Sequence, residues 1–137
     1  MTKEAEFQLL IKDLSARVPY GVYVEYDNGD GVKRATKFHG NYLYLLMIGQ
    51  LQWKEFKPYL RSMSSMTESE KIELSNLFSL RNKLDFIAYG IIYEDYFTLP
   101  VIDWLNEHHF DYRGLIEMGL AIEAKKELYE LKLWHDF

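Results

Sequence analysis

The segment Asp27-Asn-Gly-Asp-Gly31 restricts the fold of this chain more than any other stretch, because it marks a tight reversal between two short strands. Asn and Gly tolerate the positive φ angles that hairpin turns require. Before this segment, apolar and polar residues alternate from Gly21 onward, which is the period of a half-buried strand. Residues 32–38 return as the partner strand. The sequence therefore predicts a β-hairpin over residues 21–38.

A helix is predicted before the hairpin and a third strand after it. Over residues 3–17, apolar side chains recur at helical spacing on one face. Pro19 ends this helix, because the residue before a proline is pushed out of helical geometry. After the hairpin, the apolar run 42–48 predicts another strand, buried on both faces or nearly so. Sequential strands with short links favour an antiparallel meander over residues 21–48.

The middle of the chain predicts one well-marked helix. Residues 53–61 are expected to form a short helical turn or an irregular link, which Pro58 limits. Thr67 and Glu70 then have the spacing of a capping box, in which each side chain satisfies a free amide at the start of a helix. We expect this helix over residues 67–80.

The last third of the chain is less uniform. Residues 84–93 are rich in β-branched and aromatic side chains and predict a further strand. Residues 100–109 predict a helix, because a proline is tolerated in the first turn. Residues 111–119 are expected to form a turn plus one short helical turn, with Gly119 as a left-handed cap. Residues 120–137 fit a strand by alternation and a helix by spacing, and both remain open.

Together these elements predict an α+β fold in one domain over residues 1–137. A small antiparallel β-sheet, made of the hairpin and meander 21–48 and a later strand, carries helices at 3–17, 67–80 and 100–109 packed on it. A chain of 137 residues has the size of a single domain and buries enough surface for a core without disulfides or a structural metal.

Composition excludes several classes of site. The chain has no cysteine, so it has no disulfide, thiol nucleophile or zinc–thiolate site. Its acidic, mixed N-terminus differs from a signal peptide, and the longest apolar run, residues 42–49, is too short to span a membrane. We therefore expect a soluble, cytoplasmic protein that has no membrane partner and needs no cofactor.

Charge is distributed unevenly. Residues 32–62 hold six of the sixteen basic residues and a single acid, Glu55, whereas residues 85–123 hold eight acids and one base, Arg113. Aromatic residues are interleaved with the bases, a combination that contacts nucleic acid through phosphates and stacking. The simpler interpretation is favoured, in which the charges pair within the domain or lie on solvated faces, because the chain as a whole is acidic. The candidate nucleic-acid-binding residues are Lys33, Arg34, Lys37, Lys54, Lys57 and Arg61.

Residues 102–124 contain the densest group of chemically versatile side chains. The candidate functional cluster is His108, His109, Asp111, Tyr112 and Arg113. Adjacent residues point about 100° apart on a helix, so the two histidines cannot easily bind one metal ion, and their spacing differs from that of metalloproteases. A structural interpretation is favoured, in which His108 extends an apolar helix face and His109, as a cation, lies near a helix end. No catalytic residue and no metal site are predicted.

The arginine of this cluster allows two interpretations. The planar guanidinium of Arg113 can bind a phosphate or a carboxylate ligand. The favoured interpretation is that Arg113 pairs with one of the nearby acids and fixes the turn. A metal-dependent hydrolase that uses His108, His109 and Asp111 is a further, less favoured hypothesis.

Three segments resemble a group of small proteins from Bacteroides-type gut bacteria, their prophages and their phages. These segments are the helix leading into Ala16-Arg-Val-Pro-Tyr-Gly-Val22, then Lys57-Pro-Tyr-Leu-Arg-Ser-Met-Ser-Ser-Met-Thr67, and Asn106-Glu-His-His-Phe-Asp-Tyr-Arg-Gly-Leu-Ile116 with Gly119-Leu-Ala-Ile-Glu-Ala124. Together they cover about a third of the chain. The chain departs from the group at Ser62, where a proline is common, and after Ala124, where Lys-Lys-Glu replaces a Pro-Glu-Gly-like turn. The group has no assigned activity, so the resemblance implies a phage or mobile-element accessory protein and no mechanism.

The sequence favours an interaction protein over an enzyme. Eleven tyrosines are an unusually large number for this length, and exposed aromatic residues near charged ones suit a binding surface. The leading hypothesis is a non-enzymatic accessory protein that binds another protein. Nucleic-acid binding through the basic block 32–62 is the alternative. The oligomeric state is not predicted.

Overall fold

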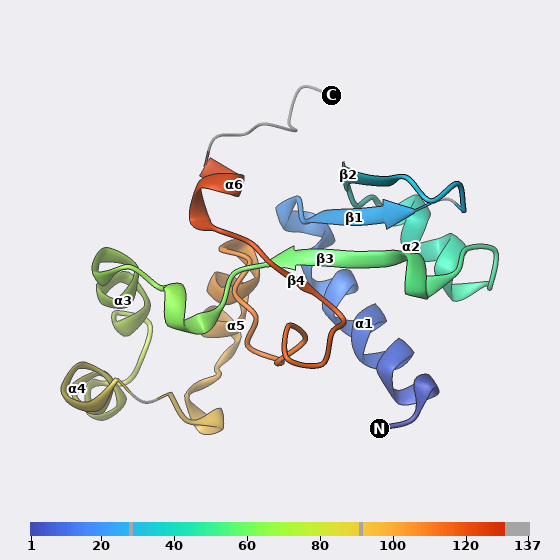
Figure 1. Ribbon diagram of the computed structural model, residues 1–137. Helices are drawn as coiled ribbons and strands as arrows, with labels where there is room; N and C mark the ends of the chain where they lie inside the picture. Colours follow the sequence, from blue (N-terminus) through green and yellow to red (C-terminus); the bar gives the residue numbers. More distant parts are fainter. Residues whose placement is uncertain (28, 91, 131–137) are drawn as a thin grey trace.

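The computed structural model describes residues 1–27, 29–90 and 92–130 (Figure 1). The helices in this part of the chain are α1 (Lys3–Arg17), α2 (Gly40–Met47), α3 (Glu68–Ser75), α4 (Leu80–Tyr89), α5 (Leu99–Glu107) and α6 (Lys126–Glu130). The strands are β1 (Tyr23–Asp27), β2 (Lys33–Lys37), β3 (Phe56–Leu60) and β4 (Ile122–Glu123). Short 3-10 helices lie at η1 (Val18–Tyr20), η2 (Trp53–Glu55), η3 (Met63–Ser65) and η4 (Glu94–Tyr96). This combination confirms the α+β class.

The first helix and the hairpin form where the sequence predicts them. The Thr2 hydroxyl caps α1 by accepting the Ala5 N–H at 3.1 Å, and Pro19 follows the end of the helix within η1. Strands β1 and β2 pair antiparallel. In the turn between them, the Asp27 carboxylate accepts the Gly29 N–H at 2.8 Å. The local signals at Pro19 and at residues 27–31 are strong enough to define these elements without tertiary context.

The sheet contains a strand that the sequence does not predict. Its order among the described residues is β2-β1-β3-β4, with β3 antiparallel to β1 and β4 parallel to β3, so the sheet is mixed rather than purely antiparallel. The expected irregular link at 53–61 is instead η2 followed by β3. Proline is normally restricted to strand edges because it lacks an N–H group. Pro58 is paired with Val24 of β1 on one side of β3. On the other side β4 pairs only with Tyr59 and Leu60, so that edge of β3 has no paired strand residue at Pro58 and the rule is satisfied.

Two predicted strands are wrong. Residues 40–47 form α2, and residues 80–89 form α4, so the meander 21–48 consists of the hairpin alone. Short apolar runs do not distinguish a buried strand from a helix by periodicity. Local caps decide the second case, because the Ser79 hydroxyl accepts the Asn82 N–H and Gly90 ends α4 in the left-handed conformation.

The remaining predictions differ from the structure mainly in their boundaries. The capping box of Thr67 and Glu70 is present, but α3 ends at Ser75 rather than at residue 80. The predicted helix 100–109 is α5, and Gly119 has the expected positive φ of 75°. Residues 120–130 contain both β4 and α6, whereas 131–137 lie outside the described residues.

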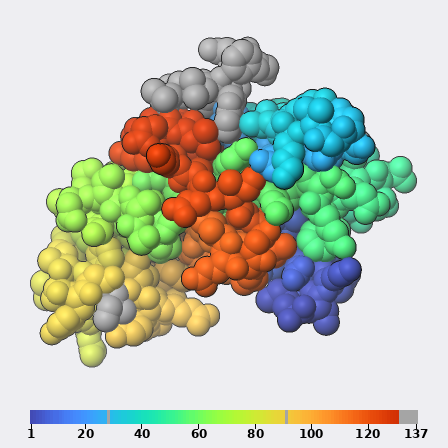
Figure 2. All heavy atoms as spheres, viewed as in Figure 1, coloured from blue at the N-terminus to red at the C-terminus, as the bar shows by residue number. Residues whose placement is uncertain are grey.

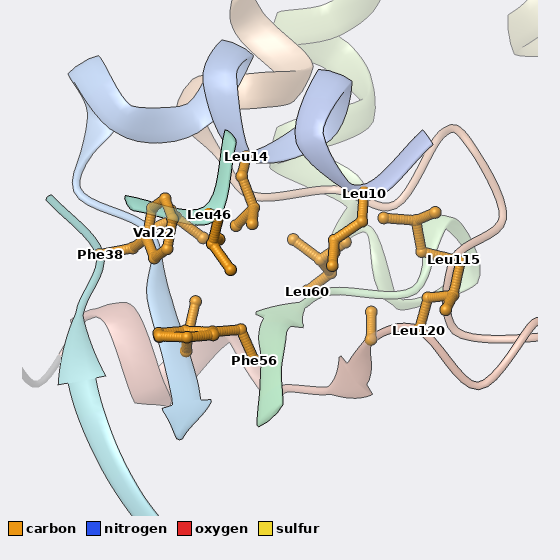
Figure 3. Close-up of a cluster of buried hydrophobic side chains, with 11 residues drawn as sticks. Leu10, Leu14, Val22, Phe38, Leu46, Phe56, Leu60, Leu115 and Leu120 are labelled. Atoms are coloured by element: carbon orange, nitrogen blue, oxygen red, sulfur yellow. The ribbon is translucent and has the colours of Figure 1, made fainter. Parts of the chain in front are cut away.

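One hydrophobic cluster joins α1 to the sheet. Figure 3 shows Leu10 and Leu14 of α1 directed toward the strand residues, and both leucines are almost completely buried. Val24, Phe56 and Leu60 lie in the same cluster. The register pairs Tyr26 with Phe56 and Val24 with Pro58, so these residues share the face that α1 covers.

A second cluster lies among the later helices. Its buried members are Met66, Leu74, Phe86, Val101, Trp104, Leu105 and Phe110. Helices α3, α4 and α5 therefore bury their apolar faces against one another, to one side of the sheet, as Figure 1 shows. Of the three predicted helices, α1 covers a sheet face, whereas α3 and α5 belong to this second cluster. Arg61 and Phe110, paired by an isolated parallel bridge, join the two parts.

Candidate functional site

An open groove of about 1270 Å³ lies where the two clusters meet. Its walls come from α1, η3, the end of α4, α5 and the turn at residues 111–117. Figure 2 shows this turn, in orange, between the yellow α4–α5 region and the blue start of α1. The groove therefore combines segments that are far apart in the sequence.

The lining of the groove is apolar in its interior and charged at its edges. Half-buried Met63, Ile92, Phe97, Ile102 and Ile116 supply apolar surface. Exposed charged side chains of both signs lie around them, namely Lys12, Lys71, Glu94, Glu117 and Glu123. An apolar centre with a charged rim is the usual composition of a protein-binding surface.

A buried ion network fixes one wall of the groove. The Asp13 carboxylate accepts hydrogen bonds from Arg17 Nε at 2.9 Å and from Arg113 Nη1 at 2.7 Å. Arg17 also donates from Nη2 to the Phe110 carbonyl at 2.6 Å. Asp13 and Arg17 are fully buried, so this network ties α1 rigidly to residues 110–113.

Tyr112 packs against the two arginines of this network. Its ring has the Arg113 guanidinium 4.6 Å and the Arg17 guanidinium 5.5 Å from its centroid. Its hydroxyl donates to Asn106 Oδ1 at 2.9 Å. These contacts support the structural interpretation of Arg113, which pairs with an acid and holds the turn.

A second buried ion pair lies next to the groove residues Ser62 and Lys71 in the chain. Arg61 donates to both carboxylate oxygens of Glu70 at 2.7 Å, and its guanidinium lies 4.1 Å from the centroid of the Phe110 ring. Burial by itself would raise the pKa of Glu70. Hydrogen bonds from Arg61 and from the Thr67 N–H outweigh it and lower this pKa to about 2.

Asp111 organises the turn that follows it. Its two carboxylate oxygens accept the N–H groups of Leu115 and Ile116, each at 2.9 Å. Free N–H groups at the start of a turn are commonly satisfied in this way. Asp111 is thus committed to backbone hydrogen bonds within the fold.

The two histidines point to different environments. His108 stacks on Trp104 with centroids 4.1 Å apart, and its Nδ1 lies 2.9 Å from the Trp104 carbonyl oxygen. His109 is buried and stacks on Tyr129 at 3.7 Å. Burial, together with the positive charges of Arg17, His108 and Arg61, lowers the pKa of His109 to about 3. His109 is therefore neutral near pH 7, which corrects the expectation of a cation at a helix end.

The structure consequently separates the candidate cluster. Asp111, Tyr112 and Arg113 line the groove, whereas His108 lies against Trp104 and His109 against Tyr129. In the part of the chain that the structure describes, no three His, Asp or Glu side chains are arranged to hold a metal ion. The hypothesis of a metal-dependent hydrolase gains no geometric support.

The basic residues do not form one patch. Lys33, Lys37 and Lys57 share the sheet face opposite α1, because they lie across from Asp27, Tyr23 and Glu25 in the register. Arg34 pairs with Asp30 at 2.7 Å on the other side of the hairpin. Lys54 lies near Lys3 and Glu6 of α1. Arg61 is buried against Glu70 and cannot reach a nucleic acid.

Sequence reasoning missed several residues that build the site. Asp13 and Arg17 have the i, i+4 spacing of a helical ion pair, a signal that was present but gave no indication of burial. Tyr129 carries no local signal. Its hydroxyl donates to the Tyr59 carbonyl at 2.6 Å and accepts the Tyr23 N–H at 3.2 Å, contacts that only the tertiary fold creates.

Comparisons of the chain with family models, curated proteins and solved structures give no match. Within the described residues, none of the helices has the length and apolar character needed to cross a membrane.

Proposed function

We propose that this protein is a non-enzymatic accessory protein of phage or mobile-element origin that binds a segment of another protein in the groove. The observation that carries the proposal is the groove itself, with its apolar interior and its rim of both charge signs. The bound segment presents apolar side chains to Ile92, Phe97 and Ile102 and charged ones to the rim.

The size of the groove favours a macromolecular ligand. Small-molecule sites usually have volumes of about 300–1,000 Å³ and enclose most of the ligand. The groove has about 1270 Å³ and is open to solvent, so a small ligand would leave much of it unfilled. A helix or an extended peptide is a ligand of suitable size for an open groove.

The chemistry of the lining favours binding over catalysis. Ser62 and Ser64 line the groove, and their hydroxyls lie 2.7 Å from each other. Within the described residues, no hydrogen bond joins either hydroxyl to a His, Asp, Glu or Lys side chain. Nucleophilic catalysis needs a hydroxyl activated by a neighbouring base. Asp111 and Arg113 are held by other groups of the fold, so they serve the shape of the groove.

All three segments that resemble phage and bacterial proteins contribute to the groove, the first of them through Lys12 of α1. Residues 57–67 supply Ser62, Met63, Ser64 and Met66, and residues 106–116 supply the wall from Asp111 to Ile116. The proposed phage or mobile-element origin rests on the resemblance of these segments, and their presence in the groove links that resemblance to the proposed binding site. It also indicates that lysate from Bacteroides-type bacteria is the material in which to search for the partner.

The test is a pull-down of the tagged protein from that lysate after nuclease treatment. We compare the wild type with Ile102→Glu, which places a charge in the groove, and with Ile48→Glu, which makes the same change at an exposed site on the far end of α2. We expect a stoichiometric partner that the Ile48 variant retains and the Ile102 variant loses. A photo-crosslinking residue at position 102, but not at 48, should attach to the same partner.

Two results would overturn the proposal. A partner that binds the Ile102 variant and the wild type equally well would place binding outside the groove, provided that both variants have the wild-type circular dichroism spectrum. Recovery that disappears with nuclease would instead favour the basic residues 33–57 and nucleic-acid binding.

A further inference from the structure

Among the described residues, exposed apolar side chains are concentrated in the part of the chain from α3 to the start of α5, which contains α4. Eight of the fourteen large hydrophobic side chains that are exposed among the described residues lie between residues 72 and 99. They are Ile72, Leu77, Leu80, Leu84, Ile87, Tyr89, Tyr93 and Leu99. Scattered apolar residues on a surface need no explanation, but a contiguous group indicates an interface.

Three of these residues form a stripe along α4. Leu80, Leu84 and Ile87 have the spacing i, i+4, i+7 of one helix face and are 74%, 59% and 63% exposed. Phe86 points the other way and is buried, with its ring 5.4 Å from the ring of Phe78. The helix therefore carries apolar side chains on two sides, with Phe86 directed toward the core and the stripe of Leu80, Leu84 and Ile87 directed toward solvent.

The position of α4 leaves this stripe accessible. Figure 1 shows α4 at the outer edge of the molecule, beyond α3 and far from the sheet. None of Leu80, Leu84 and Ile87 lines the groove. The stripe is thus a second surface, separate from the proposed binding groove.

Charges at the two ends of the stripe point to the occupant. Arg81 is exposed in the first turn of α4, whereas Lys83 is half-buried and donates to Asn76. Beside the other half of the helix lies η4, held there because Phe78 contacts both Phe86 and Tyr96. This segment carries exposed Glu94 and Asp95, and the sequence has no Lys or Arg between Lys83 and Arg113.

A surface that is basic at one end and acidic at the other is complementary to itself. A two-fold axis places each patch against the same patch of a second copy, in reversed direction. The Arg81 end of one copy then meets the acidic end of the other, and Leu84 lies near the axis. The two helices run antiparallel, so their dipoles also interact favourably.

We propose that the outer face of α4 pairs with α4 of a second copy of this chain, antiparallel about a two-fold axis near Leu84. The contact joins Leu80 of each copy to Ile87 of the other and places Arg81 near Asp95 of the other. This inference does not depend on the groove or on its partner.

The absence of cysteine from the chain allows a direct test by disulfide crosslinking. Under mild oxidation, the Leu84→Cys variant should form a covalent dimer rapidly, because its two thiols face each other at the axis. The Tyr44→Cys variant on α2 is exposed to a similar extent, 63%, and measures random collision. A mixture of Leu80→Cys and Ile87→Cys should crosslink faster than either variant alone, because antiparallel pairing joins these two positions.

Sedimentation of the full chain over a range of concentrations provides the second test. The wild type and Met47→Asp should dimerise, whereas Leu84→Asp with Ile87→Asp should raise the dissociation constant by about 100-fold or more. Arg81→Glu and Asp95→Lys should each weaken the dimer, and the two changes together should restore it. Asp95 is chosen over Glu94 because Glu94 also lines the groove.

The proposal fails if the wild type remains monomeric at all concentrations, or if Leu84→Cys crosslinks no faster than Tyr44→Cys. It also fails if a dimer exists but is indifferent to the α4 substitutions, since the interface then lies elsewhere. Crosslinking of Leu80→Cys to itself in preference to Ile87→Cys would replace the antiparallel arrangement with a parallel one and overturn the proposal.

Discussion

The Tyr129 hydroxyl occupies a gap at the end of the β1–β3 ladder. Val24 pairs with Pro58, so Tyr23 and Tyr59 are the next residues in register. The Tyr129 hydroxyl bridges them by accepting from the Tyr23 N–H and donating to the Tyr59 carbonyl. Burial raises the pKa of Tyr129, so its hydroxyl keeps the proton that it donates. One side chain therefore attaches α6 to the sheet.

We expect Tyr129→Phe to lower the free energy of unfolding by about 1–3 kcal/mol, because it removes both hydrogen bonds and keeps the ring. Urea denaturation followed by circular dichroism measures the change. Tyr44→Phe, at an exposed position, is the control and should have no effect. Equal stability of the wild type and the Tyr129 variant would show that the bridge is dispensable.

His109 makes stability depend on pH in a defined range. Its folded pKa of about 3 lies below its ordinary value of 6.5, so between these values the unfolded chain binds a proton that the folded chain does not. The part of the unfolding free energy that depends on neutral His109 is therefore fully present above pH 6.5 and is lost as the pH decreases toward 3. Glu70, with a folded pKa of about 2 against 4.5, adds to this loss only below about pH 4.5.

The range from pH 6.5 to 4.5 therefore separates His109 from Glu70. We expect His109→Asn to flatten the decline in unfolding free energy over this range. Asn is a suitable replacement because it tolerates the positive φ of 62° at this position. The exposed His39→Asn should keep the wild-type slope. A slope that survives in the His109 variant would assign the titration to another group.

At the level of elements, the N-cap residues of α3 and α5 differ in the hydrogen bonds that they make to the first turn of their helix. Thr67 precedes α3 and forms a complete capping box with Glu70. Thr98 precedes α5, but its side chain makes no capping hydrogen bond. The same residue type thus occupies two N-cap positions with different bonding.

We expect Thr67→Ala to cost about 1 kcal/mol of stability, because a helix N–H loses its acceptor. Thr98→Ala should change the stability by much less. Thermal and chemical denaturation of the two variants measure the difference. Similar costs at both sites would mean that the hydrogen bond of the capping box contributes little.

Local signals predicted elements well wherever a cap or a turn residue enforced one conformation. Pro19, the Asp27–Gly31 turn and the Thr67 capping box all lie at observed boundaries. The strands predicted at 42–48 and 84–93 are wrong, because their apolar side chains suit either conformation. For α4 the deciding signals are local, namely the caps at Ser79 and Gly90, which the apolar composition outweighed in the prediction. The sequence does not predict β3, because a proline such as Pro58 argues against a strand that is paired on both sides. The structure permits Pro58 because β4 pairs only with Tyr59 and Leu60.

At the scale of the whole molecule, the six candidate nucleic-acid-binding residues do not collect on one surface. The lysines at 33, 37 and 57 lie on the sheet face opposite α1, around the acidic Glu25 and Asp27. The groove lies at the other end of the fold, between α1 and the later helices. Binding through the groove should therefore be independent of these lysines.

We expect the triple variant Lys33→Gln, Lys37→Gln and Lys57→Gln to capture the same partner as the wild type after nuclease treatment. Its affinity for DNA and RNA should be weak and close to that of the wild type at physiological salt. Mobility-shift assays at several salt concentrations check the second point. Loss of the partner, or a steep salt dependence that the triple variant abolishes, would favour the nucleic-acid alternative.

The sequence by itself determined the α+β class, the helix that ends before Pro19, the hairpin and the capped start of α3, because each depends on neighbours within a few positions. It also singled out residues 108–113, of which Asp111, Tyr112 and Arg113 line the groove. Only the tertiary structure decided how these residues are used. Asp13 and Arg113 are a hundred positions apart in the chain, and Tyr129 and Tyr59 are seventy apart. Burial then turned these distant pairs into fixed hydrogen bonds, separated His108 from His109 and formed the groove, because desolvation acts on the packed chain and not on its sequence.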